Sequence, residues 1–310
     1  MTQKYLMANG LRLAYDEFGD PKKTAIVLVM GLGTQMIAWP ETLCQGLADK
    51  GYRVIRFDNR DIGLSQQIEP KKPVNLIKLV LRSKLGLSLN VPYSLRDMAA
   101  DAIGVLDFLE IESAHWVGAS MGGMICQVIA AEFPERSLSL TSIMSTTGNP
   151  ELPQPSLKMA KQMLIRPNRS NEAAYLKHSL ATWKIIGSPD YPPKQEDLSR
   201  RIIESLRRAY SPNGYTHQFA AILKSGDRRH LLRKITVPTQ IIHGKADVLV
   251  PVEGGIDTAK NIKQAKLELI EGMGHDLPAQ LIPKFIKLIS ENCGNAQPQS
   301  AVTDKKKAVA

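Results

Sequence analysis

Cysteine is scarce in this sequence. Its 310 residues include three cysteines, Cys44, Cys126 and Cys293, and no two of them have CxxC spacing. This set offers neither the paired framework of a disulfide-stabilised fold nor the ligands of a cysteine-bound metal. Because such a chain fits a reducing environment best, we expect a cytoplasmic protein.

Long hydrophobic runs are also missing. No stretch approaches the roughly 18 consecutive apolar residues that a membrane-spanning helix needs. The opening segment MTQKYLMANGLRLAYDEFGD lacks the basic start and apolar centre of a signal peptide. We therefore expect a soluble protein without an integral membrane segment.

Aromatic residues make up only 5% of the chain, although its net charge is +10. The positive excess lies in residues 66–96, with six Lys/Arg against one Glu, and in residues 146–225, with twelve Lys/Arg against six acidic residues. Basic residues interleaved with aromatics, or a helix-turn-helix pattern, would indicate nucleic-acid binding, and neither is present. We expect no nucleic-acid partner, and the charge instead favours anionic substrates or peripheral contact with an anionic membrane surface.

Apolar segments of strand length alternate with helical patterns along most of the chain. Continuous apolar strands are typical of a parallel sheet covered by helices on both faces, so the pattern predicts a doubly wound α/β fold. Near the start, Asn9-Gly10 separates two alternating runs and predicts a β-hairpin. The predicted strands are 25–30, 53–57, 115–119, 139–145, 239–244 and 266–272, and the clearest helical patterns are 40–51, 94–111 and 121–134.

The alternation stops between residues 146 and 225. This segment is proline-rich and has four helical patterns, at 155–165, 171–187, 194–210 and 214–226. A crossover between strands needs only one helix, so we interpret the segment as a helical cap, with an ordinary helical excursion as the alternative. The predicted organisation is a core of residues 1–145 and 226–293, a cap of 146–225 to which 66–94 contribute, and a disordered tail, 294–310.

The segment VGASMGGM (117–124) places Ser120 between Gly118 and Gly122, where a buried strand meets a helix. A G-x-S-x-G match alone arises by accident in roughly one such chain in ten. In this context the glycines allow a sharp turn that exposes the hydroxyl at the end of the strand. Ser120 is therefore a candidate nucleophile rather than a small residue at a turn.

A serine hydroxyl needs a base, and the base needs an acid to orient it. His275, in EGMGHDLP, follows a predicted strand and precedes a helix, whereas the other five histidines lie within strands, in the cap or at its exit. Asp247, in HGKADVLVP, follows the preceding strand. Ser120, Asp247 and His275 thus form a predicted triad, and the backbone N–H groups of Leu32, in MGLG, and Met121 are the predicted oxyanion-hole donors.

Together, MGLG, FDNRDIGLS, VGASMGG, HGKADVLVP and GMGHDLP resemble the α/β-hydrolase superfamily over roughly residues 5–293. LVMGLGTQMIAWPE, GYRVIRFDNRDIGLS and ITVPTQIIHGKADVLVP are similar to its aclacinomycin methylesterase-like branch. That resemblance implies cleavage of methyl or other small carboxylic esters, with no metal or organic cofactor. It also implies that FDNRDIGLS forms a structural turn near the site. The sequence departs from the family pattern at Met30, where many relatives have a histidine before the oxyanion turn.

Several alternatives remain open at this point. The same triad serves thioesterases, lactonases, amidases, C–C hydrolases and cofactor-free perhydrolases, and a non-catalytic receptor could use the same pocket. The apolar helical segment 74–89 could pack under the cap, line the pocket, or contact a membrane or a second subunit, and packing under the cap is the first expectation. The sequence does not determine the oligomeric state.

Overall fold

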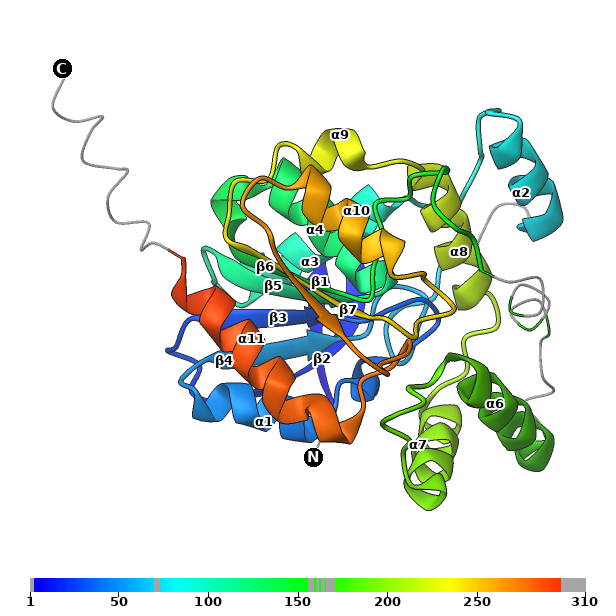
Figure 1. Ribbon diagram of the computed structural model, residues 1–310, viewed down its shortest axis with the longest axis horizontal. Coiled ribbons are helices and arrows are strands. Elements are labelled where there is room, and N and C mark those ends of the chain that lie inside the picture. The colour runs from blue at the N-terminus through cyan, green and yellow to red at the C-terminus, as the bar shows by residue number, and fades with distance from the viewer. Residues whose placement is uncertain are drawn as a thin grey trace, which may run out of the picture.

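The computed structural model describes residues 3–69, 73–155, 159, 162, 165 and 171–296. Its centre is an eight-stranded sheet with the order β1-β2-β4-β3-β5-β6-β7-β8 (Figure 1). The pairs β1–β2 and β2–β4 are antiparallel, and all other neighbours are parallel. The strands are β1 (Lys4–Ala8), β2 (Leu11–Phe18), β3 (Ala25–Val29), β4 (Arg53–Phe57), β5 (Ala114–Ala119), β6 (Ser137–Ile143), β7 (Thr239–Gly244) and β8 (Lys266–Ile270).

The predicted fold class, α/β with a mostly parallel sheet, is confirmed. Each of the six predicted parallel strands is present, and β7 agrees at both ends. β6 stops at Ile143, two residues before the predicted end, because Met144 takes a positive φ of 44° that no strand continues through. The Asn9-Gly10 hairpin is also present, with φ of 50° and 75° as a two-residue turn requires.

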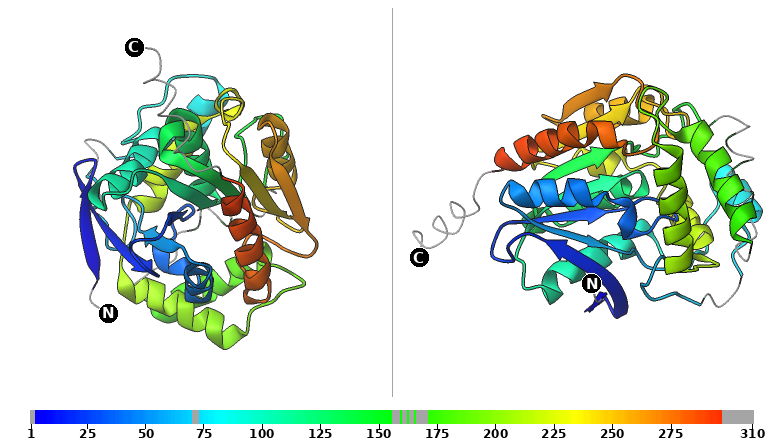
Figure 2. Two further views of the ribbon diagram at one scale, coloured as in Figure 1. Left: turned by 90° about the vertical axis from the view of Figure 1, so that its left-hand side faces the viewer. Right: turned by 90° about the horizontal axis from the view of Figure 1, so that it is seen from below.

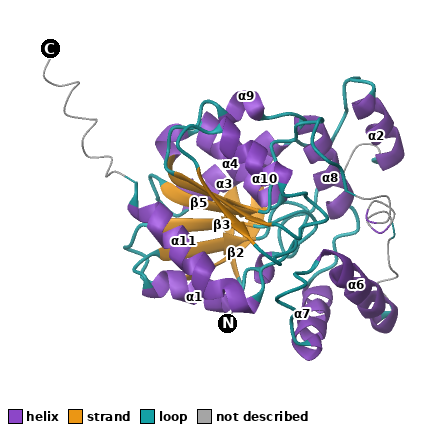
Figure 3. Ribbon diagram, in the orientation of Figure 1, coloured by secondary structure: helices purple, strands orange, loops and turns teal. Residues whose placement is uncertain are grey.

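Helices cover both faces of the sheet (Figure 3). One face packs against α1 (Glu41–Asp49) and α11 (Ile282–Gly294), and the other against α3 (Leu95–Phe108) and α4 (Met121–Glu132). Every residue of β3, β4, β5 and β7 is buried. The two-sided cover explains why these strands are rich in apolar residues.

Shorter elements complete the core. They are the helices α9 (Arg229–Leu232) and α10 (Glu253–Asn261) and the 3-10 turns η1 (Met36–Ala38), η2 (Pro134–Arg136) and η3 (Ala279–Leu281). Helix α2 (Leu76–Lys84) lies outside the sheet layers, in the segment after β4. In the part of the chain that the structure describes, no helix is both long and apolar enough to cross a membrane.

Between β6 and β7 the chain forms α6 (Glu172–Ile186), α7 (Gln195–Arg208) and α8 (Gly214–Ser225). Because β6 and β7 are parallel neighbours, these helices are an insertion between adjacent strands. Figure 2 shows α6 and α7 beyond the sheet, at the opposite end of the molecule from the C-terminal end of α11. The predicted helix 155–165 lies almost entirely outside the described residues, as does the predicted tail from residue 297 onward.

The C-terminal end of α7 is fixed to the core by one arginine. Arg208 Nη1 donates to Asp58 Oδ2, just after β4, and to Gln35 Oε1, both at 2.7 Å. Gln35 Nε2 in turn donates to the Ser205 carbonyl at 2.7 Å. The inserted helices are thus held at the edge where the parallel strands end.

Candidate active site

Ser120 occupies the turn between β5 and α4. Its φ of 55° and ψ of −120° form a strained conformation for a residue with a side chain. Its backbone N–H donates to the Ile143 carbonyl (2.9 Å), and its carbonyl accepts from Ser145 Oγ (2.8 Å) and the Met124 N–H (3.2 Å). These contacts with β6, the loop after it and α4 hold the strained turn in place.

The flanking glycines are required by close backbone packing. A Cβ atom at Gly122 would lie 1.9 Å from the carbonyl oxygen of Val29 in β3. At Gly118 it would lie 2.2 Å from the Gly122 carbonyl oxygen. Since neither backbone can accommodate that contact, any side chain would displace the turn, which is the reason for G-x-S-x-G at this position.

The side chains of Ser120, Asp247 and His275 meet at the carboxyl ends of β5, β7 and β8. His275 Nε2 lies 3.0 Å from Ser120 Oγ, and His275 Nδ1 lies 2.7 Å from Asp247 Oδ2. With Asp247 as a carboxylate, Nδ1 carries the proton that it donates, and Nε2 is free to accept from the hydroxyl. This is the geometry that activates a serine nucleophile.

Asp247 is buried and fully engaged. Its Oδ1 accepts from the Leu249 and Val250 N–H groups at 2.9 and 2.8 Å, and its Oδ2 also lies 3.4 Å from His243 Nε2. Burial alone would raise the pKa of Asp247, but attraction to His275 and hydrogen bonds from both histidines outweigh it and lower the pKa below its ordinary value. The carboxylate therefore stays ionised, as an orienting acid must.

The His275 loop is braced by the segment that follows α6. The His275 N–H donates to the carbonyl of Ile186, the last residue of α6, at 2.7 Å. Ser188 Oγ accepts from the Gly274 N–H at 2.9 Å and donates to Asp276 Oδ1. The position of the imidazole thus depends on the inserted helices as well as on the sheet.

The turn after β3 lies directly beside Ser120. A Cβ atom at Gly31 would be 3.1 Å from Ser120 Cβ and 3.7 Å from its Oγ. Among the described residues, no protein acceptor is recorded for the N–H groups of Leu32, the next residue, or of Met121, the first residue of α4. An N–H group without an acceptor can bind an anion, and the positive end of α4 favours an anion beside Met121.

Gln218 in α8 holds this turn. Its Oε1 accepts from the Gly33 N–H at 2.8 Å, and its Nε2 donates to the Arg60 carbonyl at 3.0 Å. On the other side of the turn, Asn59 Nδ2 donates to the Met30 carbonyl at 2.9 Å. Met30 itself is buried, so the loop is supported here by Asn59 and Gln218.

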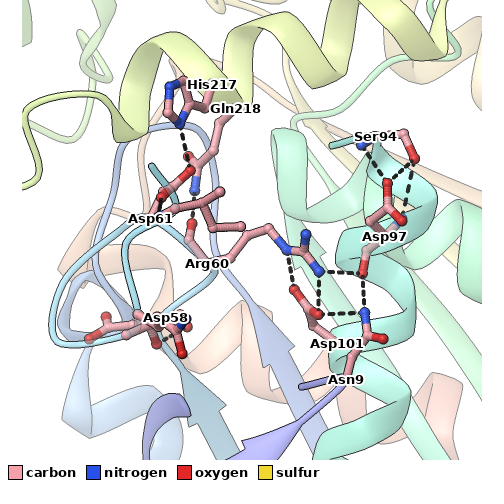
Figure 4. Close-up of polar contacts among 12 residues, drawn as sticks. Asn9, Asp58, Arg60, Asp61, Ser94, Asp97, Asp101, His217 and Gln218 are labelled. Atoms are coloured by element: carbon pink, nitrogen blue, oxygen red, sulfur yellow. Dashed lines mark hydrogen bonds and ion pairs between the residues drawn. The ribbon is translucent and has the colours of Figure 1, made fainter. Parts of the chain in front are cut away.

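The FDNRDIGLS segment is a network of buried ion pairs (Figure 4). Arg60 makes two hydrogen bonds to the Asp101 carboxylate, both at 2.5 Å, and Asp61 Oδ2 lies 2.9 Å from His217 Nδ1. The second oxygen of Asp61 accepts from the Ile68 N–H. Because both oxygens are engaged, Asp61 shapes the loop, in agreement with the structural turn implied by the resemblance.

A family model described as the alpha/beta hydrolase fold matches residues 24–279. This chain belongs to the alpha/beta hydrolase fold family. Its curated relatives include rhodomycin D methylesterase of Streptomyces peucetius, 26% identical over 296 residues, which cover 90% of this chain and 93% of that protein. Another is 3-oxoadipate enol-lactonase 2 of Acinetobacter baylyi, 26% identical over 86% of this chain and 87% of that one.

Solved structures agree on the fold of this alpha/beta hydrolase. A meta-cleavage product hydrolase from Pseudomonas fluorescens superposes with a TM-score of 0.73 at 20% identity, over 94% of this chain and 97% of that one. The family model and the methylesterase relative confirm the sequence resemblance to the superfamily and to methylesterases.

Sequence reasoning found the three side chains that meet at the site of this alpha/beta hydrolase, but not those that position them. Gln218 lies in α8, His243 in β7 and Ser188 in the loop after α6, and burial alone explains a polar residue at each of these positions. Asp276 is the one supporting residue with a local signal, because it directly follows His275.

Proposed function

We propose that this alpha/beta hydrolase is a serine esterase that cleaves carboxylic esters through an acyl-enzyme on Ser120. The observation that supports this most directly is the unbroken line of hydrogen bonds from Ser120 Oγ through His275 to Asp247, at 3.0 and 2.7 Å. The methylesterase and enol-lactonase named among the relatives are consistent with attack on an ester carbonyl.

In the proposed mechanism, His275 Nε2 takes the proton of Ser120 as its oxygen attacks the ester carbonyl carbon. The carbonyl oxygen becomes an oxyanion that accepts hydrogen bonds from the N–H groups of Leu32 and Met121. When the tetrahedral intermediate collapses, the alcohol leaves with the proton from His275. Water then attacks the acyl-enzyme by the same route, releases the acid and restores Ser120.

Asp247 acts in both half-reactions by holding the His275 ring and stabilising the imidazolium. Its two backbone donors at 2.9 and 2.8 Å fix the carboxylate and leave Oδ2 directed at the ring. This arrangement avoids any reorientation as charge develops, which is where fixed dipoles lower a barrier most.

We further propose that residues 146–225, with 66–94, form a cap that selects the substrate, a small or methyl ester of a bulky apolar acid. The contacts of Ile186 and Ser188 with the His275 loop support this proposal, because they place cap backbone next to the base. The three free, buried cysteines support a cytoplasmic location.

Lactone or C–C bond hydrolysis is the competing activity, since relatives with those names share this fold. Three kinds of substrate separate ester, lactone and C–C bond hydrolysis. They are methyl and p-nitrophenyl esters of graded acyl length, an enol-lactone, and a substrate of C–C hydrolases. We expect the highest kcat/KM on a simple ester, and loss of about 10⁴-fold or more in Ser120→Ala.

An organophosphonate probe provides an independent test. It should label the wild type at Ser120 and leave Ser120→Ala unlabelled. Absence of an adduct on the wild type would contradict the assignment as a serine hydrolase and would favour a non-catalytic receptor. A lactone or C–C preference with intact labelling would contradict the ester assignment alone.

A further inference from the structure

Helix α2 attaches to the rest of the molecule by one face. Leu79, together with Leu89, is buried against Ala220 of α8, with Val91 and Leu223 packed around them. Figure 1 shows α2 beside α8 and apart from the sheet. The sequence expectation that this segment packs under the cap accounts for this face of the helix only.

The opposite face of α2 is apolar and exposed. Ile77, Leu81 and Leu85 have exposed fractions of 70, 57 and 72%. Their spacing of four residues places them in one stripe, about 160° around the helix axis from Leu79. We call these three residues the α2 stripe; Leu87, 47% exposed, lies just beyond it. An exposed apolar row of this kind usually marks a binding surface.

All charges on α2 and in the described sequence that flanks it, residues 73–96, are positive. The helical repeat places Lys78 and Arg82 along one side and Lys84 along the other. Residues 73–96 contain no Asp or Glu. Among the described residues, none of the three cations forms an ion pair.

This charge pattern decides between the possible occupants. A second copy docked face to face would bring its own lysines against these, and like charges oppose that contact. The stripe is also far smaller than the roughly 20–30 residues per side of a stable protein interface. An anionic lipid surface supplies both missing partners, because acyl chains accept the apolar row and headgroup phosphates accept the flanking cations.

We propose that α2 is an interfacial anchor that binds this enzyme peripherally to an anionic lipid membrane. Ile77, Leu81 and Leu85 enter the boundary between headgroups and acyl chains, while Lys78 and Lys84 extend to the phosphates. Helix α8 separates the anchor from the turn beside Ser120, because Gln218 on α8 binds Gly33. The site is therefore one helix away from the bound surface.

Flotation with lipid vesicles tests the proposal on the full chain. Vesicles of phosphatidylcholine alone are compared with vesicles containing 30 mol% phosphatidylserine, each at low and high salt (roughly 0.05 and 0.5 M). The wild type should bind the anionic vesicles at low salt, bind them more weakly at high salt, and bind the neutral vesicles at least tenfold more weakly.

Two variants locate the binding surface. Leu81→Glu should lower the partition coefficient at least tenfold, since it places a carboxylate in the apolar row. Lys78→Gln should lower it about fivefold, the effect expected of one cation near an anionic surface. Phe108→Glu is the matched control: Phe108 is 50% exposed at the end of α3, away from α2, and its replacement should leave binding unchanged.

Several results would overturn the proposal. One is wild-type binding that does not depend on phosphatidylserine; another is an equal loss in Leu81→Glu and Phe108→Glu. A dimer of the wild type that Leu81→Glu dissociates in sedimentation velocity would show instead that a second copy covers the stripe. Far-UV circular dichroism and thermal unfolding of the same samples report the folding of each variant, and because neither measures hydrolysis, this result stays separate from the proposed function.

Discussion

At the scale of single residues, the supporting contacts of this site are as specific as the triad itself. Gln218 is fully buried and satisfies the Gly33 N–H with one end of its amide and the Arg60 carbonyl with the other. It therefore joins Gly33, the residue after the proposed oxyanion donor Leu32, to the loop after β4. Gln218 is a positioning residue, because it acts on the reaction only through that turn.

Replacement of Gln218 by alanine should lower kcat by about 10- to 100-fold with KM changed less than about threefold. Loss of one oxyanion donor costs about 10²–10³ in kcat, and a displaced turn loses part of that amount. Steady-state kinetics on a p-nitrophenyl ester measure kcat and KM separately. Gln127→Ala, another fully buried glutamine, is the control for destabilisation alone. Equal kinetic effects in the two variants would argue against a positioning role.

At the scale of elements, the segment after α6 links the inserted helices to the base. Ser188 bridges the Gly274 N–H and the Asp276 carboxylate on either side of His275. The Ser188 hydroxyl thus connects the segment after α6 to the residues on both sides of His275.

Ser188→Ala should therefore reduce kcat by about tenfold, since one lost buried hydrogen-bond bridge costs roughly 1–2 kcal/mol. The rate of phosphonate labelling at Ser120 should fall in parallel, because both reactions need His275 in place. Thr182→Val removes a hydroxyl of α6 whose hydrogen bonds, among the described residues, stay within the inserted segment, to Gln162 and the His178 carbonyl. If Thr182→Val slows labelling as much as Ser188→Ala does, the effect does not arise from the hydrogen bonds between Ser188 and the His275 loop.

The same scale explains why the sequence indicated three side chains that lie together in the structure. Ser120, Asp247 and His275 were found because each follows a fully or partly apolar strand, and parallel strands bring their carboxyl ends to one edge. Gln218 and Ser188 act across 185 and 86 residues of sequence, on Gly33 and Gly274. Nothing local distinguishes such a residue from an ordinary buried polar one, so these contacts emerge only from the folded chain.

The exposure of α2 marks another limit. The sequence favoured packing under the cap and left pocket lining and contact with a membrane or a second subunit open; in the structure Leu79 alone is buried in the helix, while Ile77 and Leu81 face solvent. Apolar content does not reveal how many neighbours a helix has, because that depends on the elements around it.

At the scale of the whole molecule, the two-sided core buries groups far from the site whose titration affects global stability. His115 in β5 is 3% exposed, bonds to Ser139 Oγ at 2.8 Å and stacks edge-on with Tyr52. Burial lowers its pKa from 6.5 to about 4. The folded protein therefore keeps this imidazole neutral at pH values where the unfolded chain binds a proton.

The free energy of unfolding should therefore decrease as the pH falls from about 6.5 to 4, because the unfolded chain gains a proton that the folded chain excludes. For one such histidine the loss by pH 4.5 is about 2.5 kcal/mol. His115→Gln keeps a partner for Ser139 but cannot titrate, so urea unfolding at pH 7.5 and 4.5 should show a correspondingly smaller decrease in this variant. The exposed His230 provides the control, and His230→Gln should follow the wild type. An identical pH dependence in His115→Gln and the wild type would mean that acid sensitivity arises from other buried groups of the core.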